Sequence, residues 1–263
     1  MVSNRKETEG LMKRYYHLFK TFKNWWIYIT YKYGFAVMET LVFETRNGVI
    51  VEVPLRLLHT FKEIFMDECY LAGLERPIPS GATVIDIGAN AGYFTLFAAS
   101  RFTDARVFSF EPVPVNCTQL ERHLNLNGSR QIKCFPQAVA GQAGEISLSI
   151  DSSDSFTTSA TMIFAQTDAQ IEKIKVPCVT LAQVMDENDI NKCDLLKMDC
   201  EGAEYGILYN CPPEYLQRID QIAMEVHRGE KENQKIEAME AFFKKQGFVT
   251  RRKSVGMLWA WRR

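Results

Sequence analysis

Short apolar runs alternate with segments of helical periodicity along most of this 263-residue chain. Five of the runs have the length of buried strands, and they cover residues 82–85, 107–110, 132–135, 194–199 and 221–226. Apolar positions recur at helical spacing over residues 93–100, 116–126 and 230–246. Strands that alternate with helices predict a doubly wound α/β fold with a Rossmann-like sheet.

The C-terminal residues follow a different pattern, in which apolar and polar positions alternate. Residues 248–251 and 256–261 are therefore predicted to form an antiparallel ribbon at the edge of the sheet. Two further short strands are predicted at 138–140 and 146–150, on either side of a glycine-containing turn. The expected sheet is thus mainly parallel, with an antiparallel C-terminal strand.

The region between these strands and the fourth core strand carries weaker signals. The polar stretch 151–160 has no periodicity and is predicted to be a loop, either a solvated connector or a segment that closes over a substrate. Residues 176–181 read as a strand, and Pro177 places it at a sheet edge because proline has no N–H to donate.

An N-terminal extension, residues 1–78, precedes the predicted sheet domain at 79–263. It contains a predicted hairpin, 41–43 and 49–53, closed by an Asn-Gly turn, and a predicted helix over 55–74. Before the hairpin, a basic aromatic helix is predicted, whose shared face holds Leu11, Tyr15, Leu18, Phe22 and Trp25. This helix is expected to dock on its own domain, while a second subunit or, through residues 11–33, an anionic membrane or a lipid-linked substrate remain alternatives.

The composition narrows the function classes. Lysine and arginine total 31 against 32 acidic residues, so no global positive field indicates nucleic-acid binding. The seven cysteines form no CxxC pair and no zinc-ligand spacing, which is typical of reduced thiols. No secretory signal and no uninterrupted apolar run of about 18 residues is present, so a cytoplasmic protein, peripheral to a membrane at most, is expected.

The most informative motif is the glycine-rich turn after the first core strand, with the pattern D-x-G-x-N-x-G from Asp86 to Gly92. A strand that ends in such a turn and opens a helix is typical of nucleotide-like ligand binding. The dinucleotide pattern G-x-G-x-x-G is not met, because Asn90 and Tyr93 occupy glycine positions. A carboxylate at Asp86 repels a pyrophosphate but suits an α-amino group, and Glu111 after the second strand suits ribose hydroxyls. S-adenosylmethionine fits these charges better than NAD.

A second cluster of candidates follows two later strands. One strand ends in Lys197-Met198-Asp199-Cys200-Glu201-Gly202-Ala203-Glu204, and the next ends in Glu225-Val226-His227. Carboxylates and a histidine beside one ligand suit proton removal or a divalent metal. Alternatively, Lys197 and Glu201 form an ion pair and the histidine is structural.

The motifs in this order, VIDIGANAGYFT, FSFEPVPVN, LLKMDCEGAE and MEVH, resemble the FkbM family of S-adenosylmethionine-dependent methyltransferases. The resemblance implies a class I methyltransferase sheet and a hydroxyl acceptor on a sugar, glycan, glycolipid or polyketide. It also implies a set of cofactor-binding residues: Asp86, Gly88, Asn90, Gly92 and Glu111. Ala138 and Asp199 are predicted as further cofactor-binding residues. One departure is Ala182 after Thr180-Leu181, where the family often has aspartate, and it puts only a local helix cap in doubt.

The expected activity is O-methylation, with His227, Asp199 and Glu201 as catalytic residues. His227 is the first candidate for the base because its ordinary pKa suits proton transfer near neutrality, and Asp199 is the second. A metal held by Asp199, Glu225 and His227 stays open, but no resident metal is predicted. The alternative is a non-catalytic protein of the same fold that acts through its basic aromatic N-terminus; RNA methylation and NAD chemistry are disfavoured by the charge balance and the glycine pattern.

Overall fold

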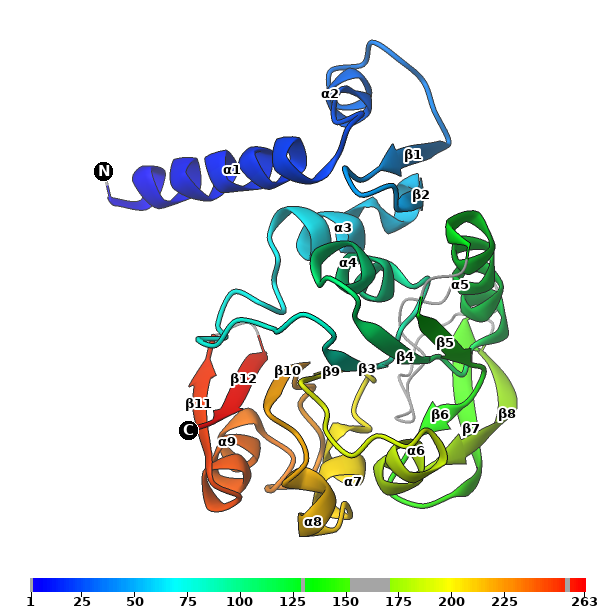
Figure 1. Ribbon diagram of the computed structural model, residues 1–263, viewed down its shortest axis with the longest axis vertical. Coiled ribbons are helices and arrows are strands. Elements are labelled where there is room, and N and C mark those ends of the chain that lie inside the picture. The colour runs from blue at the N-terminus through cyan, green and yellow to red at the C-terminus, as the bar shows by residue number, and fades with distance from the viewer. Residues whose placement is uncertain (1, 129–130, 152–170, 254–255) are drawn as a thin grey trace.

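The predicted core strands and the C-terminal ribbon form one seven-stranded sheet (Figure 1). The computed structural model describes residues 2–128, 131–151, 171–253 and 256–263. The strand order is β11-β12-β10-β9-β3-β4-β5, and β12 runs antiparallel to the other six strands. The strands are β3 (Thr83–Ile87), β4 (Arg106–Phe110), β5 (Ile132–Phe135), β9 (Leu195–Met198), β10 (Gln221–Glu225), β11 (Phe248–Arg252) and β12 (Met257–Arg262). The doubly wound α/β sheet with an antiparallel C-terminal strand is therefore confirmed.

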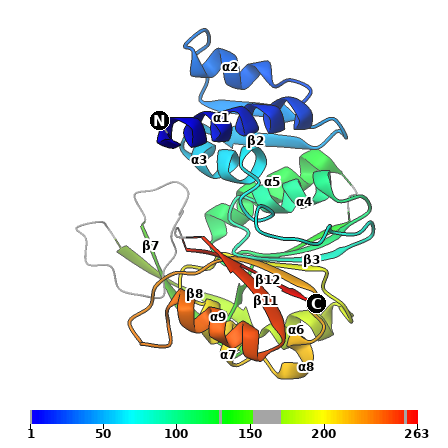
Figure 2. The ribbon, with the colours of Figure 1, turned by 90° about the vertical axis from the view of Figure 1, so that its left-hand side faces the viewer.

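Helices cover both faces of this sheet (Figures 1 and 2). On one face lie α4 (Tyr93–Arg101) and α5 (Pro114–Asn127), and on the other lie α6 (Leu181–Glu187), α7 (Glu204–Tyr209), α8 (Pro213–Leu216) and α9 (Ile236–Lys245). Every residue of the central strand β3 is buried, because a parallel strand covered on both faces has no solvated side. The sheet is thus a rigid platform for groups at its carboxyl edge.

A separate three-stranded sheet, in the order β6-β8-β7, follows β5. Its strands are β6 (Ala138–Val139), β7 (Gly144–Asp151) and β8 (Ile171–Val179). The edge position predicted from Pro177 is wrong for the strand as a whole, since β8 lies in the middle. In the described residues β6 pairs only with Cys178 and Val179, so Pro177 still has a strand neighbour on one side only. The predicted loop at 151–160 lies outside the described residues, except for Asp151, which ends β7.

Helix lengths differ from the prediction at two places. The helix predicted over 230–246 begins only at Ile236, because residues 228–235 form turns closed by hydrogen bonds such as Gly229 N to Gln234 O, 2.9 Å. The helix predicted over 55–74 ends at Met66, after a 3-10 turn (Leu55–Leu57), α3 (Leu58–Phe61) and a π-helical turn (Lys62–Met66). Glu68 then adopts a left-handed conformation with φ of 49°, which turns the chain towards the C-terminal strands.

The N-terminal extension consists of α1 (Val2–Thr21), α2 (Trp26–Lys32) and the confirmed hairpin of β1 (Thr40–Glu44) and β2 (Ile50–Pro54). Helix α1 stops before Trp25 because the Asn24 side chain bonds to β1, to Val42 O and Glu44 N. Trp25 therefore lies beyond the helix on whose face it was expected.

One face of α1 docks on the chain's own domain, as predicted. Leu18 and Phe22 are fully buried in the same hydrophobic cluster as residues of β3 and α4. His17 Nδ1 lies 2.9 Å from Met66 O, and Arg14 pairs with Asp67. Leu11 departs from the prediction, since it is 47% exposed and the buried face begins only one turn later.

Helix α6 begins with a capping box. Its presence answers the doubt raised by Ala182, which stands where the family often has aspartate. Thr180 Oγ1 accepts from Gln183 N, and Gln183 Oε1 accepts from Thr180 N.

We expect Thr180→Ala to lower the free energy of unfolding by about 1 kcal/mol, because an N-cap hydrogen bond is lost. Urea unfolding measures this, and Gln183→Ala in the Thr180→Ala background should add little. A full second loss on the double variant would show that the two bonds do not form one cap.

Candidate active site

The glycine-rich turn between β3 and α4 is held by contacts with both neighbouring strands. Gly88 N and Ala89 N each donate to Phe110 O at 3.0 Å, which ties the turn to the end of β4. On the other side, a Cβ on Gly88 would lie 1.8 Å from Asp199 O, and the Gly88 φ is 75°. Only glycine fits there, because the loop after β9 passes directly against its backbone.

Glu111, at the end of β4, connects this turn to the next helix. Its Oε2 accepts from Asn90 N at 2.8 Å, and its Oε1 accepts from Val113 N at 3.0 Å and Asn116 Nδ2 at 3.2 Å. Burial raises the pKa of the Glu111 carboxyl, although these donors oppose the shift. An ionised carboxylate offers about four lone-pair sites, so Oε2 retains one for a ligand hydroxyl.

Asp86 is not placed where its motif suggested. Its side chain is fully buried under the turn, where Oδ1 lies 3.1 Å from Lys197 Nζ and Oδ2 accepts from Thr95 Oγ1 at 2.8 Å. Lys197 Nζ also donates to Gly88 O at 2.7 Å. Asp86 and Lys197 are register partners on the adjacent strands β3 and β9, so both side chains lie on one face of the sheet. The structure thus replaces the alternative Lys197–Glu201 pair with a buried Lys197–Asp86 pair.

Charge explains why this buried lysine stays protonated. Burial lowers the pKa of Lys197, but the negative charges of Asp86 and Asp199 outweigh it, so the pKa lies above the ordinary value. The cation also lies over the rings of Tyr70 and Phe94, at 5.3 and 6.0 Å from their centroids. Asp86 and Lys197 therefore brace the glycine-rich turn from beneath.

A cavity of about 1090 Å³ lies at the carboxyl edge of the sheet, just above the reported range of about 300–1,000 Å³ for ligand pockets. Seven of the site residues predicted from the sequence line it: Gly88, Asn90, Glu111, Ala138, Asp199, Glu201 and His227. Asp86 and Gly92 do not line it in the described residues. A Cβ on Gly92 would lie 2.3 Å from Leu120 Cδ1, so this glycine serves the packing of α4 against α5.

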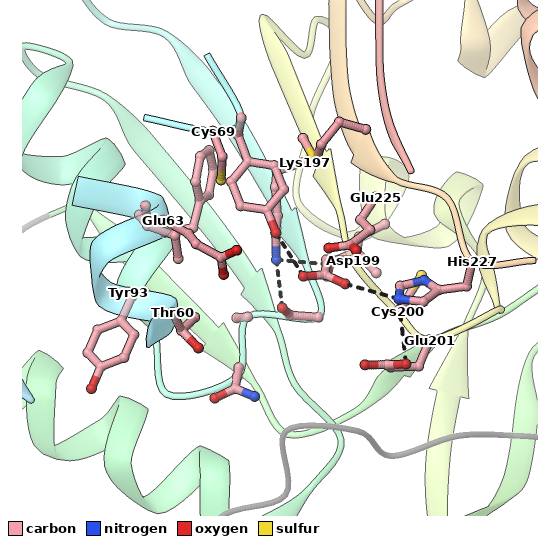
Figure 3. A pocket seen from close by; sticks show the side chains of 18 of the residues that line it. Thr60, Glu63, Cys69, Tyr93, Lys197, Asp199, Cys200, Glu201, Glu225 and His227 are labelled. Atoms are coloured by element: carbon pink, nitrogen blue, oxygen red, sulfur yellow. Dashed lines mark hydrogen bonds and ion pairs between the residues drawn. The ribbon is translucent and has the colours of Figure 1, made fainter. Parts of the chain in front are cut away.

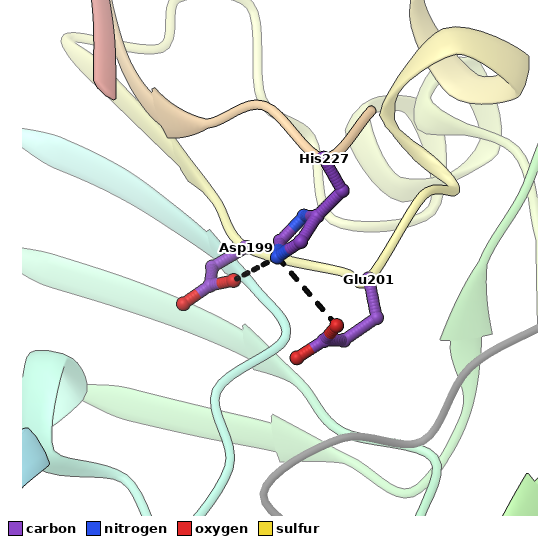
Figure 4. Close-up of side chains that lie close together, drawn as sticks. All are labelled: Asp199, Glu201 and His227. Carbon is purple, nitrogen blue, oxygen red and sulfur yellow. Dashed lines mark ion pairs between the residues drawn. The ribbon is translucent and has the colours of Figure 1, made fainter. Parts of the chain in front are cut away.

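At the far wall of the cavity, His227 is oriented by a buried carboxylate. Its Nδ1 lies 2.9 Å from Oε1 of Glu204, which is fully buried at the start of α7. The other ring nitrogen, Nε2, lies 3.5 Å from Glu201 Oε2 and 3.9 Å from Asp199 Oδ1 (Figure 4). The hydrogen bond at Nδ1 thus fixes the ring so that Nε2 meets the two carboxylates.

The pKa of His227 is not the ordinary one that was expected. Burial lowers it, but the hydrogen bond to Glu204 and the charges of Glu204, Glu201 and Asp199 raise it to about 9. At neutral pH the imidazole is therefore mostly protonated. It is a stronger base than expected, but it must lose its proton before it can accept another.

The same groups have the donor types that a divalent cation accepts. Ligand atoms of Asp199, Glu201 and His227 all lie within 4.8 Å of one another. The sequence had suggested Glu225 in place of Glu201. Glu225 lines the cavity as well, and burial raises the pKa of its carboxyl (Figure 3).

Sequence reasoning missed the contribution of the N-terminal extension to this site. Tyr70 is buried and donates from its hydroxyl to Asp199 Oδ2 at 2.7 Å, which orients the carboxylate. Thr60 and Glu63 also line the cavity (Figure 3). Nothing in the sequence near Tyr70 marks it, because the contact joins residues 129 positions apart.

The strand order, the glycine-rich turn after the central strand and the buried acid after its neighbour define the class of protein. The chain is an S-adenosylmethionine-dependent methyltransferase of the class I fold. Residues 86–250, more than half of the chain, match the family described as Methyltransferase FkbM domain. The protein belongs to the FkbM methyltransferase family, which confirms the resemblance in its motifs.

Two curated proteins and one solved structure are among those similar to this chain. The 31-O-demethyl-FK506 methyltransferase FkbM of Streptomyces tacrolimicus is 32% identical over 193 residues, which cover 64% of this chain and 73% of that protein. Methyltransferase sdnD of Sordaria araneosa is 28% identical over 194 residues, covering 63% and 73%. A methyltransferase from Streptococcus mutans, solved in complex with SAH, is similar over 80% of this chain and 97% of its own, with 10% identity and a TM-score of 0.41.

Proposed function

We propose that this protein transfers the methyl group of S-adenosylmethionine to a hydroxyl group of a sugar, a glycan or a related natural product. The observation that carries the proposal is the Glu204–His227 pair on the wall of a large cavity. Nε2 of His227 faces Asp199 and Glu201. A hydroxyl is a poor nucleophile until its proton is accepted, and a carboxylate-oriented imidazole suits this task. The similarity to a methyltransferase named for O-methylation of FK506 supports the same acceptor chemistry.

The residues divide the cavity into two ends in this proposal. Glu111, Asn90 and Ala138 would hold the cofactor, which supplies a methyl group made electrophilic by its sulfonium. Glu111 fits this role because its Oε2 keeps a lone pair for a ribose hydroxyl. At the other end, His227 accepts the acceptor's proton at Nε2, and Glu204 stabilises the imidazolium that results.

Asp199 and Glu201 assist at the acceptor end. Tyr70 holds one oxygen of Asp199, so its other oxygen remains directed to His227 and the acceptor. The two carboxylates can accept hydrogen bonds from neighbouring hydroxyls of a polyol, which would align the reacting oxygen with the methyl group. Alignment contributes much of the rate, because the donor is already activated.

The decisive experiment is a transfer assay with an isotopically labelled methyl group and a panel of sugars, glycans and macrolide alcohols. We expect label in an acid- and base-stable methyl ether, which distinguishes a hydroxyl acceptor from a carboxylate or an amine. Label in a base-labile ester or on nitrogen would refute the proposed acceptor class. S-adenosylmethionine that binds but is never turned over with any acceptor would favour a binding protein instead.

Glu111 provides a separate test of the cofactor end. We expect Glu111→Gln to weaken S-adenosylmethionine binding by about 1.5–3 kcal/mol, the usual worth of a hydrogen bond to a charged group. Titration calorimetry measures the Kd. The control variant is Glu121→Gln, whose side chain is exposed on α5. An unchanged Kd in the Glu111 variant would place the ribose elsewhere.

A further inference from the structure

Exposed apolar side chains are concentrated in the N-terminal extension. Of the ten large hydrophobic side chains that are exposed in the described part of the chain, eight lie within residues 11–37: Leu11, Met12, Tyr16, Phe19, Trp26, Tyr33, Phe35 and Val37. These eight side chains and the exposed Lys13 and Lys20 are called here the aromatic-basic surface. Such a concentration, on a protein whose other apolar residues are mostly buried, is typical of an interaction surface.

Phe19 and Trp26 of this surface belong to a continuous group of four aromatic rings, in which Tyr15 and Trp25 are partly buried. Tyr15 stacks on Phe19 with ring centroids 6.2 Å apart, Phe19 contacts Trp25 at 4.6 Å, and Trp25 contacts Trp26 at 6.1 Å. The group joins α1 to α2 at the end of the molecule away from the C-terminal helices (Figures 1 and 2). Tyrosine and tryptophan favour a boundary between apolar and aqueous surroundings.

The charge of the same segment has one sign. Residues 11–37 contain five lysines and arginines and no aspartate or glutamate, in a chain whose net charge is −1. Lys13 and Lys20 have no ion-pair partner among the residues whose side chains are described, and Lys20 lies over the Tyr16 ring at 5.6 Å. The side of α1 that carries Arg14, Leu18 and Phe22 is already committed to the chain's own domain, so the aromatic-basic surface is a second, unused side.

We propose that the aromatic-basic surface binds the surface of an anionic lipid bilayer. Aromatic side chains would enter the interface while lysines contact the lipid headgroups, as in a peripheral amphipathic helix. In the described residues no helix has the length and apolar character to cross the bilayer.

The cavity opens beside this surface. Gly10, Leu11, Lys13 and Arg14 of α1 are among its lining residues. A bilayer under α1 would therefore lie next to a wall of the cavity, where a lipid-linked sugar could enter from the membrane plane. This second step rests on the proposed function, whereas the membrane contact does not.

The test is flotation of the full-length protein with phosphatidylcholine vesicles, with and without phosphatidylglycerol. We expect association only with the anionic vesicles, lowered by salt. Tryptophan fluorescence should shift to the blue, and the signal reports on Trp25 and Trp26 because Trp259 and Trp261 are already buried. Equal binding to both vesicles, or to neither, would overturn the proposal, as would self-association that buries the surface in solution.

Matched pairs of variants test whether vesicle binding needs the aromatic-basic surface or any exposed apolar side chain. Tyr16→Ser with Trp26→Ser removes side chains that are 58% and 51% exposed, and Val42→Ser with Leu126→Ser removes two that are 43% and 40% exposed elsewhere. We expect the first pair alone to lose vesicle binding, and Lys13→Gln and Lys20→Gln to weaken it about fivefold each. Equal losses in both serine pairs would refute a specific surface.

The flotation assay needs neither cofactor nor acceptor, so its outcome is independent of the methyl-transfer assay. Vesicle binding without transfer to any hydroxyl would contradict the proposed function alone. Transfer to a soluble sugar without vesicle binding would contradict the membrane contact alone.

Discussion

Replacing His227 with glutamine is expected to lower kcat by about 10²–10⁴-fold, the usual contribution of a positioned general base. The Kd for S-adenosylmethionine should change little, because in the proposed function His227 faces the acceptor and Glu111 faces the cofactor. His59→Gln is the matched control, since its imidazole is 76% exposed and pairs only with Glu63 in the described structure. Normal turnover in the His227 variant would remove it from the mechanism and make Asp199 the candidate base.

The pH dependence follows from the raised pKa of His227. The base form must be unprotonated, so kcat/KM should rise with pH and level off above about 9, instead of near the ordinary histidine value. Glu204→Gln removes the largest of the causes that raise the pKa of His227, and it should move the midpoint of the pH profile to lower pH. A merely structural role of Glu204 would lower activity without moving the midpoint. Repeating the profile with a chelator and with added Mg²⁺ tests whether a cation occupies the same cluster.

The second large effect concerns stability. Lys197→Met leaves the carboxylate of Asp86 buried without its cation, so we expect the free energy of unfolding to fall by about 3–5 kcal/mol. Urea unfolding gives the value. Lys192→Met is the control, because Lys192 also bridges two carboxylates but is 58% exposed, and its loss should cost at most about 1 kcal/mol.

A double variant tests whether the loss comes from the unpaired charge. Asp86→Leu with Lys197→Met should be more stable than the sum of the two single losses predicts, because no charge is then left alone. Thr95 would keep Ser109 as a hydrogen-bond partner at 2.6 Å. Simple additivity of the two losses would show that Asp86 and Lys197 act independently.

The sequence predicted the sheet well because its strands are local apolar runs between glycines and prolines. It also placed Glu111 and the Asp199–Glu204 segment at the cavity, or directly behind it, since strand ends meet at one edge of a parallel sheet. Asp86 shows the limit of that reasoning. A residue near the end of a strand can face the ligand or the interior of the protein. For Asp86 the register of β3 with β9 decides this, because it pairs Asp86 with Lys197.

Other properties of the site depend on contacts between distant segments. Helical periodicity alone predicted a helix through Tyr70, whereas the chain turns at Glu68 and delivers the tyrosine to Asp199. The pKa of His227 could not be predicted either, because Glu204 and Glu201 act on it only once β9 and β10 lie side by side. Local pattern therefore identified most of the reacting groups, and tertiary packing decides their chemistry.

The contact between residues 70–73 and β12 has a consequence for biosynthesis. Trp259 Nε1 donates to Tyr70 O at 2.8 Å, and its ring fills the space above Gly73, where a Cβ would lie 2.2 Å from Trp259 Cδ2. The segment that orients Asp199 is thus anchored on a residue 189 positions further along the chain. A nascent chain cannot complete this site until Trp259 has left the ribosome.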